Sequence, residues 1–340
     1  MKRYCLILLS LFGFLTTNVA NPYDNPDTLV VARDGSGQFR NISDAIEVCR
    51  AFMDYHKVIY IKKGTYKEKI IIPQWLTNIE LCGEDRDQTI LTWDDHANIP
   101  VAMALDSWPV DIAQAIRPKD GRTMIGTFRT FTLKIQGSRI TLKNLTIENN
   151  APRLGQAVAL QADGDMLTFL NCRFLGNQDT IYTSNAHCRQ YFKDCYIEGT
   201  TDFIFGPSTA WFENCDIFCK HDSYITAAST PQDAPYGYVF NNCHIRCAEG
   251  VNQVYLGRPW RDYGYTLFMN CELPRQIRPE GWHPWQKQRE NTARYMEYNN
   301  HGEGAATAGR VGWSHQLTKK EVQKITLNEV FSVHNTWLPE

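Results

Sequence analysis

A short pattern of alternating apolar and polar positions recurs along the middle of the chain. It consists of an aromatic residue, any residue, Asn or Asp, Cys, any residue and an apolar residue. Such alternation is typical of a half-buried β-strand, whose successive side chains point to opposite faces. Five copies fit the pattern and a sixth has Leu in place of Cys: FLNCRF (169–174), FKDCYI (192–197), FENCDI (212–217), FNNCHI (240–245), FMNCEL (268–273) and LKNLTI (142–147).

The spacing of the copies predicts the architecture. Between equivalent central positions (145, 172, 195, 215, 243 and 271) the intervals are 27, 23, 20, 28 and 28 residues. These intervals are too short for a crossover helix to recur between parallel strands each time. One strand signature per period fits the coils of a parallel β-helix, in which loops of variable length bulge outward. We therefore expect an all-β fold of this kind.

Two segments outside the repeats are expected to cover the β-helix. From residue 42 to about residue 55 the sequence predicts a short N-terminal capping helix, with Ser43 as N-cap, over the exposed edge of the first coil. The stretch from about Thr318 is expected to be mixed helix and loop over the other end or a flank. The apolar stripe of the capping helix has helical spacing and consists of Ala45, Ile46, Cys49 and Phe52.

Composition and charge exclude several classes of protein. The chain has 340 residues, 43% of them hydrophobic, and a formal net charge of −2. Disordered chains combine low hydrophobicity with high net charge, and nucleic-acid-binding proteins usually show a basic excess. No apolar run reaches membrane-spanning length beyond the extreme N-terminus. We expect no nucleic-acid partner, no membrane span, and a single domain over residues 21–340.

The extreme N-terminus has the pattern of a secretory signal peptide. Lys2 and Arg3 precede an apolar stretch over about residues 5–15, and small residues lead to Ala20. This order of basic, apolar and small residues is typical of such peptides. We expect residues 1–20 to be removed and the mature chain to be exported, to the periplasm or outside the cell. The alternative interpretation is a short buried helix.

Eleven cysteines in an exported chain raise the question of disulfides. Five of them share one position of the repeat, so we expect a ladder of small, buried side chains. The alternatives are a disulfide within the ladder, most readily between Cys195 and Cys215, and a metal site, which needs converging ligands that these strands do not offer. The ladder consists of Cys172, Cys195, Cys215, Cys243 and Cys271.

The ladder also predicts the relative positions of two acidic residues. Asp179 lies seven residues after Cys172, and Asp202 lies seven residues after Cys195. If the cysteines stack, the two aspartates stack as well, at the strand spacing of about 4.8 Å. Two carboxylates so close do not both ionise cheaply, so one is expected to act as an acid and the other to be a charged group supported by a cation. The alternative is a turn or an internal polar ladder.

Amide and aromatic side chains accompany the acidic pair. Gln178 directly precedes Asp179, and Gln156 lies 23 residues before Asp179. Both amides can donate hydrogen bonds toward the same region. The nearby aromatic residues are Tyr182, Phe203 and Phe205.

At these residues the chain resembles the pectin methylesterase (pectinesterase) family. The resemblance extends from about Leu29 to about Trp337, and it implies a right-handed parallel β-helix. It also implies hydrolysis of the methyl esters of polygalacturonate (pectin) with release of methanol, without a metal or organic cofactor. The matching segments, in family order, are VARDGSGQF (31–39), GTYKE (64–68), QAVAL (156–160), QDTIY (178–182), GTTDFIFG (199–206) and LGRPW (256–260).

The resemblance implies roles for single residues. Asp202 matches the nucleophile and Asp179 the general acid/base. Gln178 matches the oxyanion-hole donor, with Gln156 beside it. Arg258 matches the arginine that pairs with the nucleophilic carboxylate and orients it. The residues that match sugar-contacting aromatics are Trp260, Tyr182 and Phe203.

One segment departs from the family pattern. From about Asp106 to Thr127 the chain is longer than the family leads us to expect, which would reshape one wall of a cleft. Farther along the chain, Trp282 and Trp285 either extend a sugar-binding platform or pack against the last coils.

Other functions stay open at this point. A β-helix glycosidase would use the same two carboxylates on a glycosidic bond, and a lyase would need a calcium-binding cluster of acids and a basic residue. A non-catalytic carbohydrate-binding β-helix would bind without turnover. The chain has no Gly-x-Ser-x-Gly elbow, which disfavours a serine hydrolase. The favoured function is a monomeric pectin methylesterase.

Overall fold

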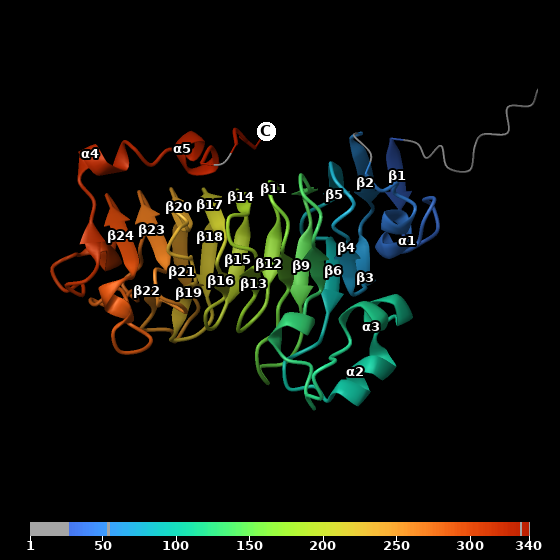
Figure 1. Cartoon of the computed structure of the whole chain (residues 1–340), viewed down its shortest axis with the longest axis horizontal. Helices are drawn as coiled ribbons and strands as arrows, with labels where there is room; N and C mark the ends of the chain where they lie inside the picture. The colour runs from blue at the N-terminus through green and yellow to red at the C-terminus, as the bar shows by residue number, and fades with distance from the viewer. Residues whose placement is uncertain (1–26, 53–54, 334, 340) are drawn as a thin grey trace, which may run out of the picture.

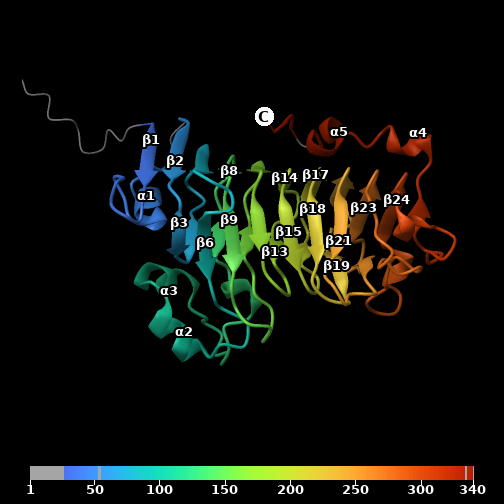
Figure 2. The same cartoon turned by 180° about the vertical axis from the view of Figure 1, so that it is seen from behind.

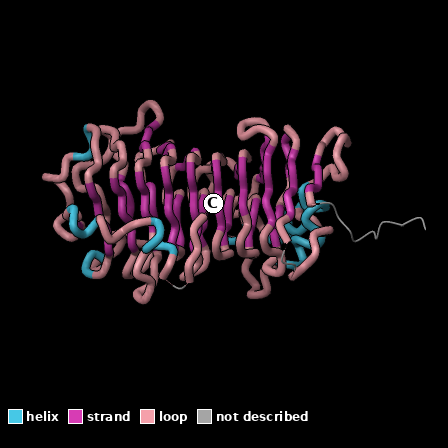
Figure 3. Tube along the Cα trace, turned by 90° about the horizontal axis from the view of Figure 1, so that it is seen from above, coloured by secondary structure: helices cyan, strands magenta, loops and turns pink. Residues whose placement is uncertain are grey.

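The computed structural model describes residues 27–52, 55–333 and 335–339. The proposed signal peptide, residues 1–20, lies outside these ranges. Three parallel β-sheets wind around one apolar core and form an elongated molecule (Figure 1). Seen from above, the strands of successive coils lie side by side along the long axis (Figure 3). The predicted parallel β-helix is therefore confirmed.

Each inner coil contributes one strand to each sheet, and every pair of neighbouring strands is parallel. The first sheet contains β1 (Thr28–Val31), β2 (Lys57–Ile61), β5 (Ile79–Gly83), β8 (Thr141–Lys143), β11 (Leu167–Leu170), β14 (Arg189–Lys193), β17 (Thr209–Glu213), β20 (Tyr238–Asn241), β23 (Tyr265–Met269), β24 (Arg294–Tyr298) and β25 (His315–Gln316). The second contains β4 (Ile70–Ile72), β7 (Leu133–Ile135), β10 (Leu160–Ala162), β13 (Ile181–Thr183), β16 (Ile204–Gly206), β19 (Tyr224–Ala228) and β22 (Tyr255–Gly257). The third contains β3 (Gly64–Lys67), β6 (Thr89–Trp93), β9 (Thr146–Asn149), β12 (Arg173–Leu175), β15 (Tyr196–Gly199), β18 (Asp216–Cys219) and β21 (His244–Cys247).

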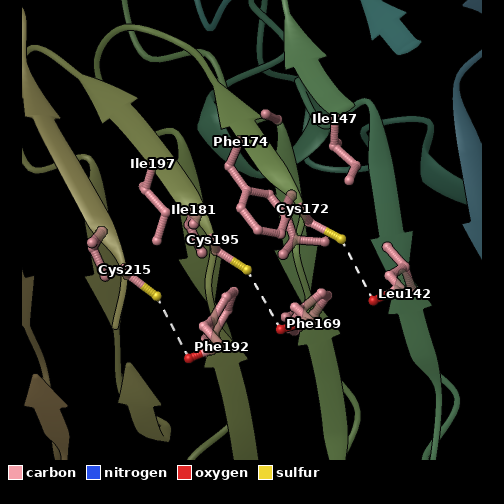
Figure 4. Packing of buried hydrophobic residues seen from close by; sticks show 14 of the residues in the cluster. Leu142, Ile147, Phe169, Cys172, Phe174, Ile181, Phe192, Cys195, Ile197 and Cys215 are labelled. Carbon is pink, nitrogen blue, oxygen red and sulfur yellow. Dashed lines mark hydrogen bonds between the residues drawn. The ribbon is translucent and has the colours of Figure 1, made fainter. Parts of the chain in front are cut away.

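The aromatic and cysteine positions of the repeat form two ladders inside the coils. The ring of Phe192 stacks on that of Phe169 with centroids 4.4 Å apart, and this stacking continues to Phe268. The five ladder cysteines are buried free thiols. Each donates to a carbonyl oxygen of the preceding coil, for example Cys195 Sγ to Phe169 O at 3.4 Å (Figure 4). The predicted ladder is confirmed, and the structure contains no Cys195–Cys215 disulfide.

This ladder predicts a labelling pattern. We expect the five ladder cysteines to resist thiol reagents in the native protein, because they are buried, and to react after denaturation without a reductant. The partly exposed thiols of Cys82 and Cys188 provide the internal comparison and should react first. Peptide mapping of the labelled protein measures the pattern. Rapid native labelling of the ladder would contradict the coil register described above.

The backbone conformation explains why the repeat has Asn or Asp before the cysteine. At this position the chain turns from the first sheet into the third with a left-handed backbone, for example φ +50° at Asn171 and +54° at Asp194. Asn and Asp tolerate this region better than other non-glycine residues. Their side chains also join adjacent coils, because Asn171 Nδ2 donates to Asn144 Oδ1 at 2.8 Å.

The capping helix is present but shorter than predicted. It is α1 (Ile42–Glu47), and it packs on the first coil through the buried Ala45 and Ile46. Its N-cap is Asn41 and not Ser43. The carboxylate of Glu68 accepts the backbone N–H groups of residues 42 and 43 and so replaces a side-chain cap. Phe52 is 85% exposed, so the predicted apolar stripe ends at Cys49.

Two helical segments lie on opposite sides of the β-helix (Figures 1 and 2). The first contains α2 (Val101–Ser107), α3 (Val110–Ile116) and the 3₁₀ turn η1 (Thr127–Arg129). The second follows the short turns η2 (Arg289–Asn291) and η3 (Glu303–Ala305) and contains α4 (Lys319–Val322) and α5 (Leu327–Phe331). Through Val330 and Phe331, α5 packs on the outer face of the first sheet, so the C-terminal stretch covers a flank. In the part of the chain that the structure describes, no helix is long and apolar enough to cross a membrane.

Candidate active site

The two aspartates lie at equivalent positions on adjacent coils. Asp179 precedes β13 by two residues and Asp202 precedes β16 by two residues, and Ile181 pairs with Ile204 in register. The backbone N–H of Asp179 donates to Thr201 O at 3.1 Å. Both aspartates have left-handed φ values, +66° and +50°, at the turn into the second sheet. The structure thus brings together the two acids that the ladder aligned.

Arg258 forms a bidentate ion pair with the carboxylate of Asp202. It follows β22, and its Nε and Nη2 donate to the two oxygens of Asp202 at 2.9 and 2.6 Å. The guanidinium carbon lies 3.9 Å from the ring centroid of Tyr224 and 3.8 Å from that of Trp285. A planar guanidinium held between two rings presents its fork in one orientation. Arg258 therefore fixes the direction in which the Asp202 carboxylate points.

The two carboxyl groups have different electrostatic surroundings. Burial raises the pKa of Asp179 well above its ordinary value, and the neighbouring Asp202 raises it further. Burial also raises the pKa of Asp202, and its hydrogen bonds to Arg258 oppose this rise. Arg258 thus lowers the pKa of Asp202, but burial of the carboxyl group, which is only 4% exposed, outweighs this effect. The order of the two still holds: Asp179 keeps a proton more readily than Asp202 does.

A cavity of about 180 Å³ opens in front of the acidic pair. Gln156 and Gln178 both reach it, and neither side-chain amide is bonded to another described residue, so their N–H groups are available to a bound molecule. Among the described residues no cluster of His, Cys, Asp and Glu could hold a metal ion. The cavity is lined by Thr127, Phe128, Gln156, Gln178, Asp179, Asp202, Phe205, Ala227, Trp260 and Trp285.

The aromatic wall of the cavity requires one correction. Phe203 was expected to contact sugar, yet it is fully buried in the core and packs against Gly199, where an added Cβ would lie 2.2 Å from Phe203 Cβ. Phe205 lines the cavity instead, although its side chain is largely buried. It stacks on Tyr182 with centroids 4.6 Å apart, and Trp260 meets it edge-on at 5.7 Å.

Three further residues of the site were missed or left open by the sequence. Trp285 lines the cavity, where it could extend a sugar-binding platform. Trp282 is buried in the core and packs against the last coils. Tyr224 occupies the position equivalent to Asp202 on the next coil, and the backbone N–H of Asp202 donates to its carbonyl oxygen. The coil register could therefore have identified Tyr224 from the sequence. Phe128 follows the long segment 106–127, and no repeat signals its place.

The substitution Arg258→Lys tests whether the two hydrogen bonds from Arg258 to Asp202 are needed for turnover. Lysine keeps the charge but not the planar fork, so we expect kcat to fall on the order of 10²-fold, the usual effect of losing one preorganised hydrogen bond. Folding should be retained, since Arg258 is partly exposed. The matched control is Arg278→Lys, which alters an arginine stacked on Tyr255 outside the cavity. Near-parental kcat in Arg258→Lys would mean that Arg258 does not orient Asp202.

Comparison with known proteins gives one consistent result. The family model Pectinesterase matches residues 28–105 and 113–334, which leaves out 106–112 within the long segment. Pectinesterase 31 of Arabidopsis thaliana is 37% identical over 295 residues, covering 86% of this chain and 88% of that protein. Several other curated relatives are longer, and this chain spans about half of their length, for example 52% of a probable pectinesterase/pectinesterase inhibitor of Brassica napus.

Solved structures share the fold. Pectin methylesterase from carrot superposes with a TM-score of 0.78 at 31% identity, covering 89% of this chain and 92% of that one. A pectin methylesterase in complex with a hexasaccharide gives a TM-score of 0.75 at 27% identity, covering 92% of this chain and 98% of that one. The β-helix is right-handed, as in those enzymes. By family model, relatives and fold, the chain belongs to the pectinesterase family of carboxylic ester hydrolases.

Proposed function

We propose that this site removes methyl groups from methyl-esterified polygalacturonate, with Asp202 as nucleophile and Asp179 as general acid and base. The observation that carries the proposal is that, of two buried carboxyl groups one coil apart in the described chain, one is paired with a cation and the other is not. Asp202 is held by the charged fork of Arg258, whereas Asp179 has no cation bonded to it in the described chain and has a strongly raised pKa. A related pectin methylesterase has been solved with a hexasaccharide bound.

In the first half of the reaction, ionised Asp202 attacks the ester carbonyl carbon. Negative charge develops on the carbonyl oxygen, where the amide N–H groups of Gln178 and Gln156 donate hydrogen bonds. Loss of one such donor typically costs about 10²–10³ in turnover. Protonated Asp179 transfers its proton to the departing methoxide oxygen. Methanol leaves, and the substrate acyl group remains on Asp202 as an anhydride.

In the second half, water cleaves the anhydride. Asp179, now ionised, takes a proton from the water as it attacks the acyl carbon, and Asp202 leaves as a carboxylate that returns to Arg258. The product is a free galacturonate carboxyl, and Asp179 is again protonated. The residues present supply each proton and electron pair. Trp260 and Tyr182 are the proposed sugar-contacting aromatics, with Phe205 packed against both rings, in place of the predicted Phe203.

The setting of the enzyme is also part of the proposal. The signal-like residues 1–20 and a polymer substrate support an exported enzyme, in the periplasm or outside the cell. We also propose a monomer in which residues 21–340 act as a single domain.

A methanol-release assay tests the proposal. The full chain is incubated with highly methylated pectin, with de-esterified pectin as the control, while the polymer length is followed. We expect methanol from the first substrate alone and no shortening of the polymer. Shortening without methanol would indicate a glycosidase or a lyase, and binding without either product would indicate a non-catalytic carbohydrate-binding protein.

A further inference from the structure

Lys69 is a completely buried cation that the proposed chemistry does not use. It follows β3, and its Nζ donates to Asp95 Oδ2 at 2.8 Å, to Arg129 O at 2.7 Å and to Phe131 O at 2.9 Å. An ammonium group has three protons, so these bonds satisfy all of them. Burial lowers the pKa of Lys69 to about 8, so the group is still largely charged at neutral pH.

Trp108 reaches the same ion pair from the helical segment. It ends α2, and its Nε1 donates to Asp95 Oδ2 at 2.6 Å, the oxygen that also accepts from Lys69. Its ring is 5% exposed and packs in an apolar cluster with Ile112 and Ile125. Trp108 belongs to residues 106–112, which the family model does not match. The donor to Asp95 therefore comes from a segment that the family model does not match.

The bonds of Lys69 end beside the cavity. Arg129 directly follows Phe128, and the ring of Phe128 lies 4.8 Å from that of Tyr182. Arg129 Nε in turn donates to Ile116 O, at the end of α3, at 2.7 Å. Lys69 therefore bonds to the carbonyl groups of two residues that closely follow Phe128 in the chain. This segment places Phe128 in the cavity wall.

We propose that Lys69, Asp95 and Trp108 are positioning residues, which fasten the α2–α3 segment to the β-helix and thereby hold Phe128 in the wall that contacts the substrate. This inference rests on the proposed function, because the property it explains is the affinity for methylated pectin. In the described part of the chain, the catalytic groups Asp179, Asp202 and Arg258 make no hydrogen bond to the three positioning residues.

The variant Trp108→Phe tests the proposal, because it keeps an aromatic ring in the apolar cluster and removes the N–H donor together with part of the indole volume. We expect KM for methylated pectin to rise roughly three- to tenfold, the scale of the net contribution of one ordinary hydrogen bond, while kcat stays within about twofold. The control is Arg122→Ala, which removes an exposed ion pair with Asp120 in the same segment and should leave both constants unchanged.

A double variant separates positioning from mere stabilisation. In Phe128→Ala the wall side chain is gone, so adding Trp108→Phe should raise KM no further, since residues that act through one another are not additive. If Trp108→Phe leaves KM unchanged, lowers kcat instead, or adds its full effect in the Phe128→Ala background, the proposal is overturned. If Trp108→Phe does not fold, Trp108→Tyr, which fills more of the space and also lacks the indole donor, is measured with the same expectations. Lack of methanol release by the unaltered enzyme would instead refute the proposed function.

Discussion

The variant Asp202→Asn is expected to lose nearly all methanol release, by a factor on the order of 10⁴ or more, as when other covalent nucleophiles are removed. The amide has no charge and does not form the anhydride with the substrate acyl group. The side chain keeps its shape, and Arg258 is partly exposed, so the variant should fold. Methanol assays at high enzyme concentration, with a thermal unfolding curve for each protein, measure the effect.

Asp194→Asn is the matched control for this substitution. Asp194 has the same left-handed backbone, φ +54°, but lies at an exposed turn where neighbouring coils already have Asn. We expect parental activity from it. Equal activity in Asp202→Asn and Asp194→Asn would show that the stacked acids are structural and that the ester is cleaved by other residues.

The variant Asp179→Asn is expected to be less severely impaired. The nucleophile remains, but no group gives a proton to methanol or takes one from water. General acid–base help is typically worth about 10²–10⁴-fold, so a measurable rate should survive on the methyl ester. That rate should increase with an ester of a more acidic alcohol, because such a group leaves without protonation.

The same change of substrate should not rescue Asp202→Asn, which makes the two variants controls for one another. The comparison requires both proteins, both esters and initial rates at saturating substrate. Rescue of Asp202→Asn in place of Asp179→Asn would reverse the roles assigned to the two carboxyl groups.

The register of the coils could be predicted from the sequence because it is set by a repeat that is buried on every turn. The side chains of Cys172 and Cys195 stack in the core, so a fixed offset of seven residues was enough to bring Asp179 and Asp202 together. The same register places Tyr224 beside Asp202. Pairing in a parallel sheet carries such information from one coil to the next.

Features that depend on packing outside the repeat could not be predicted in this way. Phe203 and Phe205 look equivalent in sequence, but Phe203 lies in the core, where Gly199 leaves room for its side chain. The capping helix stops at Glu47 although its apolar pattern continues to Cys49. The place of Phe128 depends on buried bonds from Lys69, whose partners lie about 60 residues away in the chain.

The proposed mechanism depends most on an acyl group carried by Asp202, and a rapid-mixing experiment on Asp179→Asn tests for this group directly. With an ester of an acidic alcohol, acylation of Asp202 should be fast, whereas hydrolysis of the anhydride, which lacks its base, should be slow. We expect a burst of one alcohol per enzyme, followed by slow turnover, and no burst from Asp202→Asn. Release without a burst in Asp179→Asn, or an equal burst in Asp202→Asn, would contradict Asp202 as the nucleophile.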